Sequence, residues 1–114
     1  MSTRDYHKFP SDGNGDVLWR MYSSGDDLSR SREIEFFLVF PSEDSALRFA
    51  VFMLRKGFKV SASSYDKRSK YTWQVGIYPV LKPTYVSVSE FESMLENESK
   101  TLGGSNDGWG CFEQ

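Results

Sequence analysis

The chain has 114 residues, of which 39% are hydrophobic and 16% aromatic, and its formal net charge at pH 7 is -2. This length fits one domain, of a size that buries well over half of its unfolded surface. The charge excludes a protein held on nucleic acid by bulk electrostatics, and the chain has no apolar run long enough to span a membrane.

The beginning of the chain is polar. Residues 1–11 show no periodicity, which predicts a mobile tail before a single domain over residues 12–114. Apolar side chains then recur at helical spacing and predict a short first helix: Val17, Leu18, Met21 and Tyr22. Asp16 or Asn14 is placed to cap this helix, and Gly25 to end it.

Residues 31–40 alternate between two faces, which predicts a strand with one firmly buried face. The buried face is expected to hold Ile34, Phe36, Leu38 and Phe40. The opposite face is expected to hold Glu33, Glu35, Phe37 and Val39.

A helix is predicted over residues 42–56. Pro41 ends the preceding strand, Ser42 caps the helix, and Gly57 stops it. Its broad apolar face is predicted to comprise Ala46, Leu47, Phe49, Ala50, Met53 and Leu54.

Two strands follow over residues 58–64 and 70–79, and the short link at 65–69 predicts a hairpin between them. The capping box that runs from Ser87 to Glu90 predicts the start of a last helix, which would end at Gly103 and Gly104.

Residues 103–112 combine four glycines, two aromatic residues and the chain's only cysteine. We interpret them as a tight turn followed by a short anchored element, since a free tail would not carry two aromatic side chains; a direct binding role is the alternative. The residues of this structural C-terminal motif are Gly104, Asp107, Gly108, Trp109 and Phe112.

With a final strand here, the order of elements from residue 31 is β-α-β-β-α-β. This order predicts an α+β fold, a split β-α-β (ferredoxin-like) two-layer sandwich with two helices on one sheet face and an extra N-terminal helix.

Four segments resemble a known family when they are taken in order. They are the opening Asp12-Gly13-Asn14-Gly15-Asp16-Val17-Leu18, then Val39-Phe40-Pro41, then Gly57-Phe58-Lys59-Val60, and the closing Gly103-Gly104-Ser105-Asn106-Asp107-Gly108-Trp109-Gly110. Over roughly residues 12–112 the chain resembles the regulator of ribonuclease E activity B (RraB) family. The resemblance implies a bacterial α+β domain that inhibits ribonuclease E, and so modulates RNA decay, by binding protein.

The sequence supplies few groups for catalysis or metal binding. His7 is the only histidine, and Cys111 has neither a second cysteine nor basic neighbours in sequence, so it cannot form an internal disulfide. Asp12, Asn14 and Asp16 match the first ligands of a calcium loop, but the positions that need glycine and glutamate hold Val17 and Ser23. We therefore expect no enzyme activity, no cofactor and no metal. Residues 1–8 also lack the apolar centre of a signal peptide, which predicts a cytoplasmic protein.

The predicted sheet leaves one face whose role stays open. If helices cover the Ile34 side, the other face presents aromatic and polar residues, as a protein interface of moderate affinity does. Alternatively, the first helix folds back over this face. The candidate partner-binding residues are Trp19, Tyr22, Phe37, Val39 and Tyr78.

RNA binding is the alternative function. Lys67, Arg68 and Lys70 form a basic hairpin tip between Tyr65 and Tyr71, and the split β-α-β plan is also that of RNA-recognition modules. A solvated turn explains the same residues.

Overall fold

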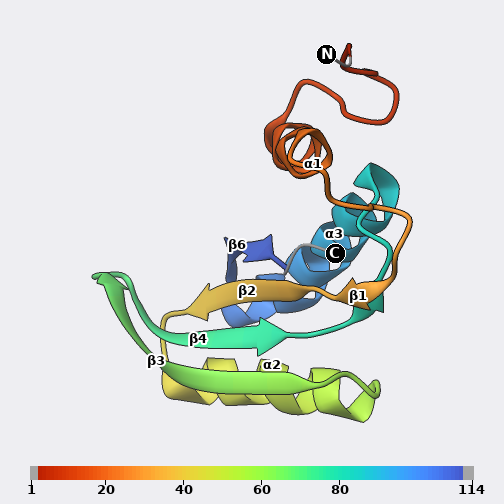
Figure 1. Cartoon of the computed structure of the whole chain (residues 1–114). Helices are drawn as coiled ribbons and strands as arrows, with labels where there is room; N and C mark the ends of the chain where they lie inside the picture. The colour runs from red at the N-terminus through yellow and green to blue at the C-terminus, as the bar shows by residue number, and fades with distance from the viewer. Residues whose placement is uncertain (1–2, 112–114) are drawn as a thin grey trace.

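The computed structural model describes residues 3–111 as a mixed α+β domain (Figure 1). Its elements are α1 (Gly13–Ser23), β1 (Arg32–Glu33), β2 (Glu35–Phe40), α2 (Glu43–Arg55), β3 (Val60–Arg68), β4 (Tyr71–Ile77), β5 (Val80–Leu81), α3 (Tyr85–Ser99), a 3-10 turn (Lys100–Leu102) and β6 (Ser105–Gly110). None of the helices described over residues 3–111 has the length and apolar character needed to cross a membrane.

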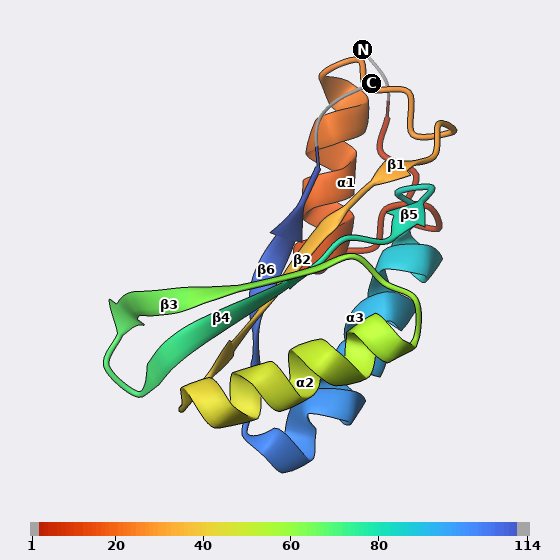
Figure 2. The same cartoon turned by 90° about the horizontal axis from the view of Figure 1, so that it is seen from below.

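Four strands form the main sheet in the order β3-β4-β2-β6, and every neighbouring pair is antiparallel. Helices α2 and α3 lie together on one side of this sheet (Figure 2). Apart from the short strand β5, which pairs with β1 outside the main sheet, the chain from β2 onward runs β-α-β-β-α-β through α2, β3, β4, α3 and β6. The α+β fold class expected from the sequence is confirmed.

The core lies between the sheet and these two helices. From β2 and the residue before it, the predicted face is buried: Ile34, Phe36, Leu38 and Phe40. The helices and β4 complete the cluster with Ala46, Phe49, Ala50, Met53, Val75, Ile77, Val88 and Leu95.

The strand predicted over residues 31–40 is divided in two at Ile34. Its first part, β1, pairs with β5, and its second part, β2, pairs with β4 and β6. The Ile34 N–H donates to the Pro79 carbonyl oxygen at 2.9 Å. Proline has no N–H to donate in return, so the regular ladder is interrupted at this point.

Helices α1 and α3 both begin earlier in the sequence than predicted. The Asp12 side chain, not that of Asn14 or Asp16, caps α1 by accepting from the Gly15 N–H. In α3 the capping box is formed by Thr84 and Ser87, one turn before the predicted box. Both possible boxes in α3 contain Ser87, and in the one that forms the N-cap residue is Thr84, which directly follows Pro83.

Helix α2 has nearly its predicted length, but its apolar residues divide between two sides. Leu47 is 42% exposed and Leu54 is 55% exposed, although both were expected in the buried face. The buried set follows the i, i+3, i+4, i+7 spacing of one helix face, and residues 47 and 54 fall outside it: Ala46, Phe49, Ala50 and Met53.

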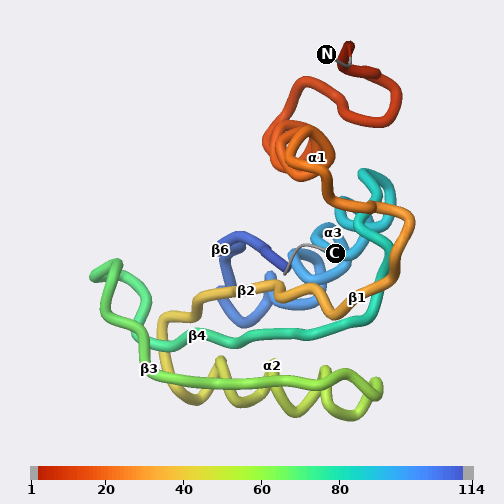
Figure 3. Tube along the Cα trace, in the orientation of Figure 1, coloured from red at the N-terminus to blue at the C-terminus, as the bar shows by residue number. Residues whose placement is uncertain are grey.

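The segment before α1 was expected to be a mobile tail, yet from residue 3 it folds beside the helix (Figure 3). Phe9 is buried, with its ring centroid 5.5 Å from that of Trp19 and 5.4 Å from that of Tyr22. Arg4 donates to the Phe9 and Pro10 carbonyl oxygens and pairs with Asp16. The segment is therefore packed, because a side chain that looks isolated in sequence meets two rings on α1.

Candidate functional site

The sheet face opposite α2 and α3 is open. In Figure 1 no helix lies in front of β2, β3 and β4, and α1 lies beyond β6, where it packs against α3. The first helix therefore does not cover this face, and Trp19 and Tyr22 on α1 belong to a separate aromatic cluster with Phe9.

Phe37 and Tyr78 form an edge-to-face pair on the open side, with ring centroids 6.5 Å apart. Phe37 lies opposite Gly76 in the β2–β4 ladder. A Cβ atom at Gly76 would lie 2.5 Å from the Tyr78 hydroxyl oxygen, so Tyr78 occupies the space that glycine leaves. Both rings are partly exposed, and we call them, with Lys59 and Ser61, the aromatic patch.

Polar side chains frame the two rings. The hydroxyl oxygens of Ser61 and Tyr78 are 2.6 Å apart, and the Lys59 Nζ lies 5.3 Å from the Tyr78 ring centroid. Lys59 also pairs with Glu33 at 3.1 Å. The aromatic patch thus offers apolar surface with hydrogen-bonding groups around it, the composition of many protein interfaces.

Beside the aromatic patch, Asp107 on β6 accepts three hydrogen bonds. The donors are the Gln74 Nε2 at 3.1 Å, the Arg68 Nη2 at 3.3 Å and the Tyr65 hydroxyl at 3.4 Å. These contacts join the β3–β4 hairpin to the opposite edge of the sheet. We call these four residues the Asp107 cluster.

The Asp107 cluster explains why Val39 is 0% exposed. Strands β4 and β6 lie on opposite sides of β2, so the Gln74–Asp107 hydrogen bond passes over β2, where Val39 pairs with Gln74 and Ser105. Val39 was predicted to be a partner-binding residue. The structure corrects this prediction, because Val39 lies on the predicted face but is buried.

The hairpin tip is shorter than predicted because β3 continues to Arg68. Arg68 lies 4.8 Å from the Tyr71 ring centroid and Lys70 lies 5.7 Å from it, while Lys67 is exposed. Arg68 is also held by Asp107, so Lys67 and Lys70 are the more available cations of this tip.

The opening and closing motifs of the chain meet at α3. The Trp109 Nε1 donates to the Asn14 Oδ1 at 2.9 Å, and the Asn14 Nδ2 donates to the Glu92 Oε1 at 2.6 Å and to the Ser89 Oγ at 3.2 Å. The Asn106 Nδ2 donates to the other Glu92 carboxylate oxygen at 2.7 Å. We call these five residues the motif network. Sequence reasoning missed Ser89 and Glu92, because no local pattern marks a helix residue that joins two distant segments.

The rest of the C-terminal motif packs closely. The Trp109 ring stacks on Phe36 at a centroid distance of 6.4 Å. A Cβ atom at Gly104 would lie 2.7 Å from the Ser99 Cβ and 2.8 Å from the Phe40 Cε1. Gly108 has a φ of 101° where the β2–β6 register shifts, a conformation that favours glycine. Phe112 lies outside the described residues.

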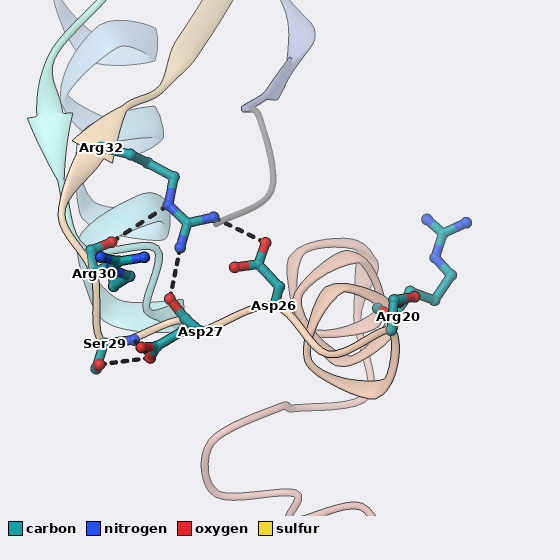
Figure 4. Close-up of polar contacts among 7 residues, drawn as sticks. Arg20, Asp26, Asp27, Ser29, Arg30 and Arg32 are labelled. Atoms are coloured by element: carbon teal, nitrogen blue, oxygen red, sulfur yellow. Dashed lines mark hydrogen bonds and ion pairs between the residues drawn. The ribbon is translucent and has the colours of Figure 1, made fainter.

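A buried ion pair holds the loop between α1 and β1 (Figure 4). The Arg32 Nη1 lies 2.8 Å from the Asp26 Oδ2, and the two side chains are 4% and 0% exposed. Arg32 also donates to the carbonyl oxygens of Asp27 and Arg30. The hydrogen bond with Asp26 raises the pKa of Arg32, and the Cys111 side chain acts on this pKa in the same direction. Neither Asp26 nor Arg32 stood out in the sequence.

A second link joins α1 to α3. The Tyr85 hydroxyl donates to the Asp12 Oδ2, while the other Asp12 oxygen caps α1. The Tyr85 hydrogen bond lowers the pKa of Asp12, and the same bond raises the pKa of Tyr85. Asp12 therefore has a structural role in place of the calcium ligation considered from sequence. Within residues 3–111 no group of three His, Cys, Asp or Glu side chains is placed to hold a metal ion.

A family model described as Regulator of ribonuclease activity B matches residues 11–111, which include the motif network, the aromatic patch and the Asp107 cluster. A search of the curated proteins finds no match.

Proposed function

The chain belongs to the RraB (Regulator of ribonuclease activity B) family. From this premise we propose that it is a non-catalytic regulator of ribonuclease E. In this proposal it acts in the cytoplasm by binding the enzyme directly and thereby slows RNA decay. The family match supports regulation of a ribonuclease, and the open sheet face supports binding as the means.

The observation that carries the proposal is the partly exposed Phe37–Tyr78 pair, on a sheet face that none of the helices described over residues 3–111 covers. Interface energy concentrates in a few aromatic or arginine side chains surrounded by weaker contacts. Two rings held edge to face are already ordered before binding, so they lose little side-chain entropy on contact with a partner.

The charged groups around these rings are already paired within the chain. Glu33 pairs with Lys59, and Asp107 pairs with Arg68. Paired charges orient and select a partner at the rim of an interface, which fits a binding surface better than a catalytic one.

Trp19 and Tyr22 are proposed as a second contact region. Tyr22 is 46% exposed on α1, and both rings pack with Phe9. A large partner would reach them by extending past the β6 edge, whereas Val39 is buried and is left out of the proposed interface.

The test is binding of purified ribonuclease E by Phe37→Ala and Tyr78→Ala variants. Loss of a central aromatic anchor commonly costs about 2 kcal/mol, so Kd should rise roughly 30-fold for either variant. Asn97→Ala is the control, because Asn97 is exposed on α3, away from the open face and from the Tyr22 region. Isothermal titration calorimetry measures Kd, and cleavage of a defined RNA measures inhibition.

The outcomes distinguish a wrong target enzyme from a wrong binding surface. If the unaltered protein neither binds nor inhibits ribonuclease E, the proposed target is wrong. If binding occurs but Phe37→Ala and Tyr78→Ala bind as well as Asn97→Ala does, the open face is not the interface.

RNA contact through the hairpin tip is the second candidate, favoured by Lys67 and Lys70 beside Tyr71. Affinity that comes from phosphate contacts falls steeply with salt concentration. Lys67→Ala with Lys70→Ala should then weaken binding of a single-stranded RNA, and capture of ribonuclease E should depend on intact RNA. Capture that survives ribonuclease treatment favours direct protein binding.

A further inference from the structure

The outward side of α2 carries an apolar stripe that no element of residues 3–111 covers. Leu47, Val51 and Leu54 follow the i, i+4, i+7 spacing and are 42%, 44% and 55% exposed. Phe52 lies beside them at 37% exposure. A surface helix of a monomer normally presents polar residues on this side, so a grouped apolar stripe indicates a contact surface.

The charges on the same side change sign along the helix. Glu43 and Asp44 occupy the first turn, whereas Arg55 lies in the last turn and Lys56 follows it. Together with Arg48, Leu47, Val51 and Phe52, the first three of these form one continuous surface along the helix. Asp44 also pairs with Arg48 at 2.9 Å within the same helix. The acidic first turn and the basic last turn, with apolar residues between them, match the same surface in reverse.

We propose that this face of α2 joins two copies of the chain in an antiparallel homodimer. The two-fold axis of this dimer passes midway between residues 49 and 50 of each α2 helix. Each residue of one helix therefore faces the residue of the other helix that lies equally far from the axis on its other side. Asp44 of one copy then faces Arg55 of the other, and Leu47 faces Phe52. The helix dipoles also run in opposite directions, which favours this arrangement.

A second copy suits the surface better than a different protein does. Glu43, Asp44, Arg48 and Arg55 balance in charge, so the face selects neither a strongly acidic nor a strongly basic partner. Its two ends are complementary to each other, and an isologous two-fold contact brings each against the other. One helix per copy buries less than about 1,200 Å², the range of transient complexes, so we expect a Kd of roughly 10–100 µM.

The inference does not depend on the proposed function. Helix α2 covers one side of the sheet (Figure 2), and Phe37 of the aromatic patch lies on the strand face opposite the core residues Phe36 and Leu38. Either surface can therefore be wrong alone. A dimer formed through α2 leaves both open sheet faces available.

Sedimentation equilibrium of the full chain tests the association, with three kinds of variant. Val51→Glu should raise the dimer Kd at least about tenfold, as expected when a charge enters an apolar contact. Asp44→Arg and Arg55→Asp should each weaken the dimer, and the double variant should recover most of the affinity because the facing pair is restored with its signs exchanged. These side chains are exposed, and circular dichroism checks that each variant remains folded.

A cysteine cross-link locates the contact. Val51→Cys, close to the proposed axis, should give a disulfide-linked dimer under mild oxidation, while Val86→Cys on α3 should not. A chain that stays monomeric at about ten times the expected Kd overturns the inference. It is also overturned if the double charge variant is weaker than both single ones, or if Val51→Glu leaves self-association unchanged but abolishes binding to ribonuclease E.

Discussion

Neighbouring phenylalanines on β2 serve opposite purposes. Phe36 is 1% exposed and contacts Phe91 and Trp109 in the core, whereas Phe37 is partly exposed against Tyr78 on the open face. A strand alternates its side chains between faces, so adjacent residues of the same type can differ completely in burial.

Phe36→Ala and Phe37→Ala should therefore differ in their effect on stability. Truncation of a core phenylalanine costs about 3–5 kcal/mol, while loss of the Phe37–Tyr78 pair should cost roughly 0.5–1.5 kcal/mol. Urea unfolding followed by circular dichroism measures both free energies. Equal losses would mean that Phe37 is a core residue, and the proposed binding surface would fail with it.

The Tyr85 hydroxyl should make the free energy of unfolding depend on pH in the acid range. Because Tyr85 lowers the pKa of Asp12 below its ordinary 3.8, folding gains stability that is present above pH 3.8 and is lost as pH falls through the folded pKa. Tyr85→Phe should reduce the free energy of unfolding at pH 6, and this deficit should shrink below pH 3.8. Tyr85 itself stays protonated throughout this range, since its pKa is raised from 10.0.

Urea titrations at pH 6 and pH 3 measure this difference. Tyr22→Phe is the control, because within residues 3–111 the structure gives the Tyr22 hydroxyl no hydrogen bond. A deficit in Tyr85→Phe that is equally large at both pH values would contradict the link to Asp12.

At the scale of elements, α1 carries two glycines in unlike surroundings. A Cβ atom at Gly15 would overlap the Pro10 carbonyl oxygen, whereas at Gly13 it would meet nothing within 4 Å. Gly15 thus allows the segment that contains Phe9 to lie against the helix, and Gly13 makes no such contribution.

Gly15→Ala should release this segment and Gly13→Ala should not. Loss of Phe9 burial costs about 1.5–3 kcal/mol, which exceeds the gain of up to about 1 kcal/mol that alanine brings to a helix. Gly13→Ala should be neutral or slightly stabilising. Thermal unfolding measures the stabilities, and trypsin cleavage after Arg4 and Lys8 should accelerate only in Gly15→Ala. Equal cleavage rates in the two variants would exclude the proposed role of Gly15.

Several elements were predictable because their signals are local. The alternation in residues 34–40 identified the buried face of β2, and the cap at Ser42 placed the start of α2. Each of these patterns reports a periodicity or a helix end that the neighbouring residues determine.

Other features depend on segments far away in sequence. The division of the strand at Ile34 follows from Pro79 across the ladder, and the burial of Val39 follows from Gln74 and Asp107 on two other strands. No pattern within residues 31–40 reports the residues of its neighbours. Phe37 and Tyr78 could be assigned to one face from strand phase, but their contact required the β2–β4 register.

At the scale of the whole molecule, the motif network ties the beginning of the chain to its end. Asn14 on α1 receives a hydrogen bond from Trp109 on β6, and both Asn14 and Asn106 donate to Glu92 on α3. Helix α1 and strand β6 are thereby held together through helix α3.

Asn14 and Trp109 should therefore contribute to stability as a coupled pair. Trp109→Phe keeps an aromatic ring against Phe36 but removes the N–H that donates to Asn14, and Asn14→Ala removes the acceptor. In a double-mutant cycle measured by urea unfolding, the coupling energy should be about 0.5–1.5 kcal/mol, the net contribution of one hydrogen bond. The control cycle combines Trp109→Phe with Gly13→Ala, which lies on the same helix, and its two effects should add. If the Asn14 cycle is also additive, the two motifs stabilise their own elements separately, and the ends of the chain meet without supporting each other.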